Sequence, residues 1–132
     1  VDDASMPLDD LTFDHHFARA LPGEPDDAPL HPRQVHGAAW SPASPSPVPA
    51  PKLLAHSPEL AAQLGFDAAA IADPRFAEAM AGNRLLPGMR PVATNYGGHQ
   101  FGHWAGQLGD GRAILLGDIA DVRGTRQELQ LK

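Results

Sequence analysis

The stretch Gly106-Gln-Leu-Gly-Asp-Gly-Arg-Ala-Ile-Leu-Leu-Gly117 decides how the fold of this chain is interpreted. Three glycines fall within its first six residues, and apolar runs lead into and out of the Gly-Asp-Gly corner. Glycine and aspartate tolerate the positive φ angles that tight hairpin turns require. We therefore predict a β-hairpin centred on this corner, with strands over residues 104–108 and 112–118.

A third extended segment is predicted at residues 125–132. There Leu129 and Leu131 alternate with polar residues that end at Lys132, which is the period of a strand with one buried face. The three segments predict an antiparallel β-meander. A glycine-bent hairpin before a strand that ends in lysine is also the layout of a kinase-type nucleotide lid, in which backbone N–H groups and a strand lysine contact phosphates.

The glycine pattern alone is weak evidence for a nucleotide site. Gly-x-x-Gly-x-Gly differs from the dinucleotide-binding pattern because no strand–helix unit follows Gly111, and from the P-loop because no Lys-Ser/Thr pair follows it. It also differs from the kinase order G-x-G-x-x-G. A plain hairpin turn, with Lys132 as a solvated edge residue, stays open as an alternative.

Short helices are predicted upstream of the glycine stretch. Phe13, Phe17 and Leu21 recur at helical spacing, and Asp10 or Thr12 could cap a helix there. Three further segments each follow a Ser or Asp N-cap, and these are residues 58–64, 68–72 and 75–81.

Leu60 and Leu64 should form the buried stripe of the second predicted helix because they are four residues apart. Between this helix and the first one, residues 41–51 carry five prolines at alternating or near-alternating positions. Proline fixes φ and lacks an N–H donor, so this segment should be extended and neither a helix nor a central strand. An SH3-type ligand is the alternative, but we favour a stiff strap across the surface.

Two pairs of histidines could suggest a metal site, which the sequence does not favour. His15 and His16 are adjacent and would point about 100° apart on a helix. His99 and His103 have the spacing of the outer residues of HExxH, but Gln100 replaces the required glutamate and several glycines would weaken a helix. We expect His99 and Gln100 to fix an irregular loop against the sheet.

Composition limits the possible classes of protein. The 132 residues fit one domain, and the net charge of −6 argues against binding to a nucleic-acid backbone. There are no cysteines, hence no disulfides, and no apolar run approaches the ~20 residues of a membrane span. We expect a cytoplasmic α+β protein with a flexible start at 1–12, helical and irregular packaging at 13–95, and the glycine-rich β-meander at 96–132.

Three long motifs resemble the N-terminal region of the selenoprotein O family. They are Tyr96-Gly-Gly-His-Gln-Phe-Gly, Trp104-Ala-Gly-Gln-Leu-Gly-Asp-Gly-Arg-Ala113 and Glu128-Leu-Gln-Leu-Lys132. The resemblance extends from about Phe13 to Lys132. It implies the start of a kinase-like upper lobe, in a pseudokinase that binds ATP in a reversed orientation.

The resemblance also implies an activity. Family members transfer AMP from ATP, with Mg²⁺ or Mn²⁺, to hydroxyl groups of proteins, and UMP transfer is attributed to bacterial members. By position, Gly109, Gly111, Arg112 and Lys132 would contact the nucleotide phosphates. The catalytic residues, the metal ligands and the glutamate partner of the lysine would lie beyond Lys132.

We therefore expect ATP and protein substrates as partners, and a fragment that is inactive alone. Because the chain would end on an unfinished sheet, we also expect self-association through the exposed edge. A non-catalytic nucleotide- or partner-binding module, and an interaction fragment that works through the proline strap, are the alternatives.

Overall fold

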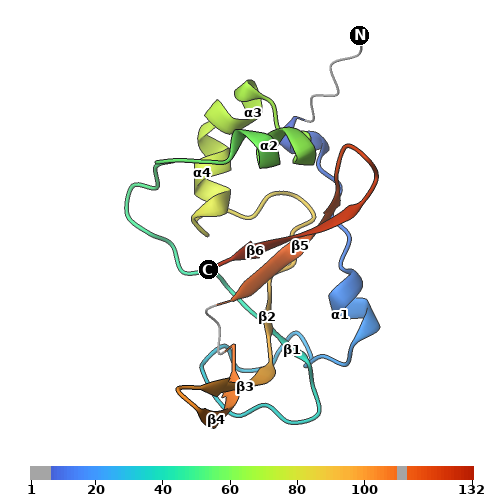
Figure 1. Ribbon diagram of the computed structural model, residues 1–132, viewed down its shortest axis with the longest axis vertical. Helices are drawn as coiled ribbons and strands as arrows, with labels where there is room; N and C mark the ends of the chain where they lie inside the picture. The colour runs from blue at the N-terminus through green and yellow to red at the C-terminus, as the bar shows by residue number, and fades with distance from the viewer. Residues whose placement is uncertain (1–6, 110–112) are drawn as a thin grey trace.

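The computed structural model describes residues 7–109 and 113–132 and shows an α+β fold (Figure 1). Its elements in chain order are the 3₁₀ turn η1 (Leu8–Asp10), α1 (His16–Ala20), β1 (Trp40–Pro42), α2 (Pro58–Leu64), α3 (Ala68–Ala72), α4 (Pro74–Met80), β2 (Val92–Thr94), β3 (Tyr96–Gln100), β4 (His103–Leu108), β5 (Ile114–Ala120) and β6 (Arg126–Leu131).

The strands form two separate antiparallel sheets. The central sheet has the order β1-β2-β5-β6, and β3 pairs only with β4 in a second, two-stranded sheet. The predicted pairing of β5 with β6 is confirmed, with Ile114 opposite Leu131 at one end and Ala120 opposite Arg126 at the other.

The predicted hairpin across the glycine corner is wrong. β4 pairs with the strand that precedes it, β3, through a two-residue turn. β5 does not pair with β4 but with β2, where Ala93 lies opposite Ile114. β2 lies within residues 83–98, where Pro87, Gly88 and Pro91 predict irregular structure, and β3 extends from this stretch to Gln100. Short strands of this kind are stabilised by partners distant in sequence, so their own residues give little warning.

Three helices, α2, α3 and α4, lie together on the β5–β6 side of the central sheet (Figure 1). Their predicted caps are confirmed: the side chain of Ser57 accepts from the Leu60 amide at 3.2 Å, and Asp67 accepts from the Ala70 amide at 2.7 Å. Gly65 ends α2 at φ 85°. The prediction for Leu60 is wrong, because its side chain is half exposed while Leu64 is buried.

The first helix is shorter than predicted. It begins at His16 because Asp14 is extended and pairs with Asp118 of β5 through two backbone hydrogen bonds of 2.8 Å. Neither Asp10 nor Thr12 caps it. Instead the buried carboxylate of Asp118 accepts from the His16 amide at 3.1 Å, a cap from 102 residues away that local sequence does not reveal.

Two groups of buried side chains hold the fold together. The larger one joins the helices to the N-terminal segment and β5 and includes Leu8, Leu11, Leu64, Phe66, Ala70, Phe76, Ala79, Leu86 and Ile119. The smaller one packs Trp40, Val92 and Leu115 against α1. Of the expected flexible start, residues 7–12 are described, and there Leu8 and Leu11 belong to the core.

The first residues of the proline-rich segment lie in β1, and the rest crosses the surface without helix or strand and bends at residues 49 and 50. Pro42 lies in an edge strand, the one place in a sheet where a missing N–H is tolerated. Farther on, the side-chain amide of Asn83 binds both backbone groups of Val48. It donates to the Val48 carbonyl at 2.8 Å and accepts from the Val48 N–H at 2.9 Å. This segment is thus tied to the chain that follows α4.

Candidate functional site

Gly109 ends β4 at a point where a side chain does not fit. It is buried, its φ is +83°, and a Cβ atom there would lie 2.0 Å from the carbonyl oxygen of Thr94 and 2.7 Å from the ring of Tyr96. Packing alone therefore requires glycine at this position, whatever the loop binds.

Lys132 lies at the same end of the central sheet. Leu131 is opposite Ile114, so Lys132 follows beside residue 113, four positions after Gly109. The Lys132 side chain is exposed, and among the residues that the structure describes no ion pair involves it. Strand alternation places Lys132 on the sheet face opposite to Leu131.

Two of the four predicted site residues, Gly111 and Arg112, lie outside the described residues. Of the two that are described, Gly109 precedes this segment in the chain, and Lys132 lies beside residue 113, which follows it. The predicted contact of these four residues with phosphate stays a prediction.

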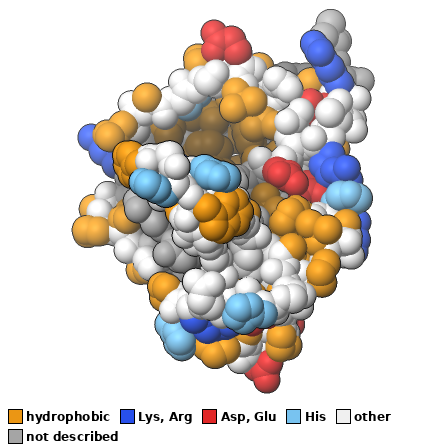
Figure 2. All heavy atoms as spheres, turned by 60° about the horizontal axis from the view of Figure 1, so that its bottom comes forward, with side chains coloured by type: hydrophobic (Ala, Val, Ile, Leu, Met, Phe, Trp, Pro, Cys, Tyr) orange, Lys and Arg blue, Asp and Glu red, His pale blue; other side chains and the backbone are white. Residues whose placement is uncertain are grey.

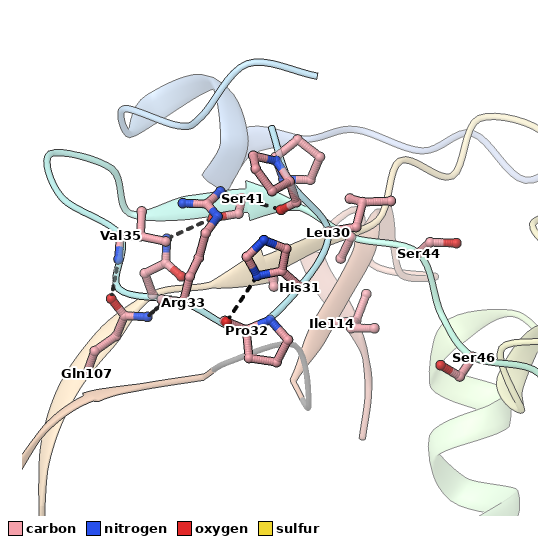
Figure 3. Close-up of a pocket in the computed structure, with 15 residues that line it drawn as sticks. Leu30, His31, Pro32, Arg33, Val35, Ser41, Ser44, Ser46, Gln107 and Ile114 are labelled. Atoms are coloured by element: carbon pink, nitrogen blue, oxygen red, sulfur yellow. Dashed lines mark hydrogen bonds between the residues drawn. The ribbon is translucent and has the colours of Figure 1, made fainter. Parts of the chain in front are cut away.

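Gln107 holds the start of this site in place. Its side-chain amide donates to the Arg33 carbonyl and accepts from the Val35 N–H, both at 2.8 Å (Figure 3). This two-point contact fixes the end of β4 to a loop more than seventy residues earlier. The role of Gln107 could not be predicted from the sequence, although the residue lies inside the glycine stretch, because no pattern in residues 33–35 identifies them as its partner.

A hollow of about 210 Å³ lies beside the site, above the cross-strand row of Ser41, Ala93 and Ile114. Figure 3 shows His31 and Arg33 from the early loop on one side of it and Ser44 and Ser46 from the strap on another. Because Ile114 and Leu131 share one face of the sheet, this hollow is on the face away from Lys132.

Arg33 is the charged group at this hollow. It forms an ion pair with Glu24, which also accepts a hydrogen bond from Ser41 at 2.7 Å. The Arg33 guanidinium, and then the Ser41 hydroxyl, hold the pKa of Glu24 below its usual value. The Nε atom of Arg33 is buried without a protein partner among the described residues.

The motif Tyr96–Gln100 does not fix a loop against the sheet as expected. His99 and Gln100 are exposed on the β3–β4 hairpin, and the His99 ring packs edge-on against Trp104 with centroids 5.1 Å apart. Gln107 provides the anchoring contact instead. In the described ranges, no group of three or more His, Asp or Glu side chains could hold a metal ion, and no helix is long and apolar enough to cross a membrane.

The fold is that of an α+β protein in which Gly109 and Lys132 lie at the same end of an antiparallel sheet. Residues 34–132 match the family model described as protein adenylyltransferase SelO, and the chain belongs to this family.

Several relatives share most of this chain. The protein nucleotidyltransferase YdiU of Azoarcus sp. (strain BH72) is 60% identical over 122 residues, which are 92% of this chain and 23% of the relative. The protein of the same name from Aromatoleum aromaticum is 55% identical over 129 residues, 95% of this chain and 24% of the relative. The chain thus spans about a quarter of the length of the curated relatives it matches.

Proposed function

We propose that this chain is the N-terminal, nucleotide-binding part of a protein adenylyltransferase that transfers AMP from ATP to Ser, Thr or Tyr hydroxyls of proteins. Family membership is the observation that carries the proposal, and the relatives' printed name, protein nucleotidyltransferase, agrees with it. UMP is the second candidate for the transferred group. A cytoplasmic location, where ATP and protein acceptors are both available, belongs to the same proposal.

The role of the chain in this reaction is to hold phosphates. The hydroxyl oxygen of the acceptor would attack the α-phosphorus, the bond to pyrophosphate would break, and the hydroxyl proton would pass to a base outside this chain. Glycine at 109 and 111 lets backbone N–H groups approach phosphate oxygens closely. Arg112 can bind two oxygens at once, and Lys132 supplies a positive charge from the neighbouring strand.

Mg²⁺ or Mn²⁺ would accompany the nucleotide and neutralise charge on its phosphates. The described residues do not supply a metal-binding cluster. By the family resemblance, the metal ligands in this proposal belong to the part of the longer relatives that this chain does not cover.

The test is AMP transfer by a family-length protein that contains this segment. Lys132→Ala should lower transfer of labelled AMP roughly tenfold or more, because a charged phosphate contact is lost, with little change in melting temperature. Lys52→Ala is the matched control, since Lys52 is an exposed lysine that directly follows the strap. Equal rates for the two variants would remove Lys132 from the site, and a large loss of stability would make it a structural edge residue.

A non-catalytic nucleotide- or partner-binding module is the second candidate, because the chain covers only about a quarter of its relatives. Calorimetric titration with ATP and Mg²⁺ tests nucleotide binding, and the transfer assay tests catalysis. Binding without transfer in the family-length protein would favour this second candidate.

A further inference from the structure

The exposed aromatic side chains of this protein are gathered on one hairpin. Of its eight Phe, Trp and Tyr residues, only Tyr96, Phe101 and Trp104 are exposed, and all three lie on the β3–β4 hairpin. The hairpin projects from the end of the molecule opposite to the helices (Figure 1). Figure 2 turns that end toward the viewer and shows hydrophobic and histidine side chains gathered around a hollow.

The tip of the hairpin has an unfavourable residue for its conformation. Gln100 pairs with His103, so Phe101 and Gly102 form the turn, with φ angles of 50° and 79°. Such a turn prefers Asn-Gly or Asp-Gly, because a bulky residue at positive φ is strained. Phe101 is 99% exposed, so packing within the described residues does not offset this strain.

In the described part of the chain, the hydrogen bonds that join this hairpin to another segment are those of Gln107, at its base. The Gln107 amide binds the loop at 33–35, and the Tyr96 ring lies against Gly109, while the tip extends away from both. An isolated two-stranded hairpin is at best marginally stable in water. A strained phenylalanine at the end of such a hairpin is therefore best explained by a contact that the described residues do not contain.

The chemistry of the hairpin indicates what it contacts. Residues 96–109 contain no Asp, Glu, Lys or Arg. A nucleic acid or an anionic membrane surface would call for basic residues, which are lacking here. A projection rich in aromatic residues and without Lys, Arg, Asp or Glu fits an apolar cavity in protein, where exposed aromatic residues act as anchors.

We propose that the hairpin docks, through Phe101 and Trp104, into an uncharged apolar cavity on the part of the family-length protein that this chain does not cover. The relatives match nearly all of this chain, but it makes up about a quarter of their length. Docking of the tip into a second copy is the alternative that the experiment below distinguishes.

The docked hairpin would also position the glycine stretch. Tyr96 at the start of β3 lies against Gly109, and Gln107 fixes the end of β4, so a hairpin held at both tip and base has a defined orientation. This inference requires family membership only and does not rest on AMP transfer.

A photo-cross-linking experiment tests the proposal in a family-length protein. p-Benzoylphenylalanine placed at position 101 should form an intramolecular cross-link to residues outside 1–132, mapped by mass spectrometry. The same probe at Leu54, a side chain that is 89% exposed and remote in sequence, is the control. Cross-links to a second copy, to another protein or to residues within 1–132, or a yield no higher than at Leu54, would overturn the proposal.

A substitution with opposite expected effects provides a second measurement. Phe101→Asn creates a favoured Asn-Gly turn, so the melting temperature of the 132-residue chain should stay the same or rise. In the family-length protein the same change removes the anchor, and the melting temperature should fall. A rise in both proteins would show that Phe101 makes no stabilising contact, and a fall in both would show that it supports the hairpin itself.

Discussion

At the scale of single residues, several glycines of this chain leave room for an aromatic ring that packs against the backbone. A Cβ atom at Gly23 would lie 1.9 Å from the Trp40 ring, and one at Gly97 would lie 2.4 Å from the Trp104 ring. The Tyr96 ring approaches Gly109 in the same way. Two requirements can therefore explain the glycines of this chain, close packing and phosphate contact. For Gly109, close packing alone is a sufficient explanation.

The packing role of Gly109 can be measured against a neighbour in the same stretch. Gly106 has a similar φ of 75°, but a Cβ atom there meets nothing within 4 Å. Gly106→Ala should cost roughly 1 kcal/mol for the left-handed backbone alone, and Gly109→Ala about 3 kcal/mol or more because of the added clash. Urea unfolding gives both values. Equal costs would show that the Thr94 carbonyl moves aside easily.

Asp121 is a second residue whose role is set by its hydrogen bonds. It is buried in the β5–β6 turn and accepts from the amides of Arg123 and Thr125, both at 2.9 Å. Burial raises its pKa, but these bonds and those from Gln127 and Gln63 outweigh burial, and the pKa is below its ordinary value of 3.8.

The pH dependence of this contribution follows from the sign of the shift. Because the folded pKa is the lower one, the stabilisation is complete above the unfolded pKa and is lost as the pH falls through the folded pKa. Asp121→Ala should lower the melting temperature by several degrees at pH 7, and by less near pH 3. Asp27→Ala, at an exposed carboxylate, is the control. A deficit for Asp121→Ala that does not change with pH would contradict this account.

At the scale of elements, the strap is the segment whose order can be tested most directly. Both backbone groups of Val48 are bound by Asn83, so the folded protein should resist elastase between Ser41 and Lys52. Asn83→Ala should speed cleavage there severalfold, since local opening becomes easier. Arg84→Ala, which removes a neighbouring surface ion pair, should not. Rapid cleavage of the unmodified protein would instead support an accessible SH3-type ligand.

The elements that sequence predicted well are those set by local interactions. The helices α2, α3 and α4 were recognisable because Ser57, Asp67 and Asp73 cap them within a few residues. The strands β1 and β2 were not, because each has three residues and depends on partners far away in the chain. The sequence does not distinguish the predicted pairing of β4 with β5 from the observed pairing of β4 with β3, because both join strands that are close in the chain.

The candidate site was predictable only in part for the same reason. Gly109 and Lys132 follow from motif and family, and strand register places them near one end of the sheet. The contact of Gln107 with residues 33–35, and the Arg33–Glu24 pair, depend on where a loop without regular structure crosses β4. Sequence spacing carries no information on such a crossing.

At the scale of the whole molecule, the two edges of the central sheet differ. β1 has three residues and includes Pro42, which lacks an N–H donor, so this edge offers few groups for pairing with another strand. β6 has six residues, and within the described residues it pairs with β5 alone. A hollow of about 310 Å³ also lies along β6, between α2, α4 and the half-buried side chains of Leu129 and Leu131. This second edge is therefore long, partly apolar and open to pairing with another chain.

We predict that the 132-residue chain self-associates through β6 and does not transfer AMP alone. Unpaired N–H and C=O groups along a strand are a template for another strand, and an added charge there disfavours pairing. Size-exclusion chromatography with light scattering should show a concentration-dependent oligomer, and Gln130→Lys should shift it toward monomer. Gln34→Lys makes the same change in charge at an exposed residue outside the sheets, so it should leave the oligomer intact. Identical behaviour of the two variants would place the contact elsewhere, and a monomer that transfers AMP would show that the site is complete within this chain.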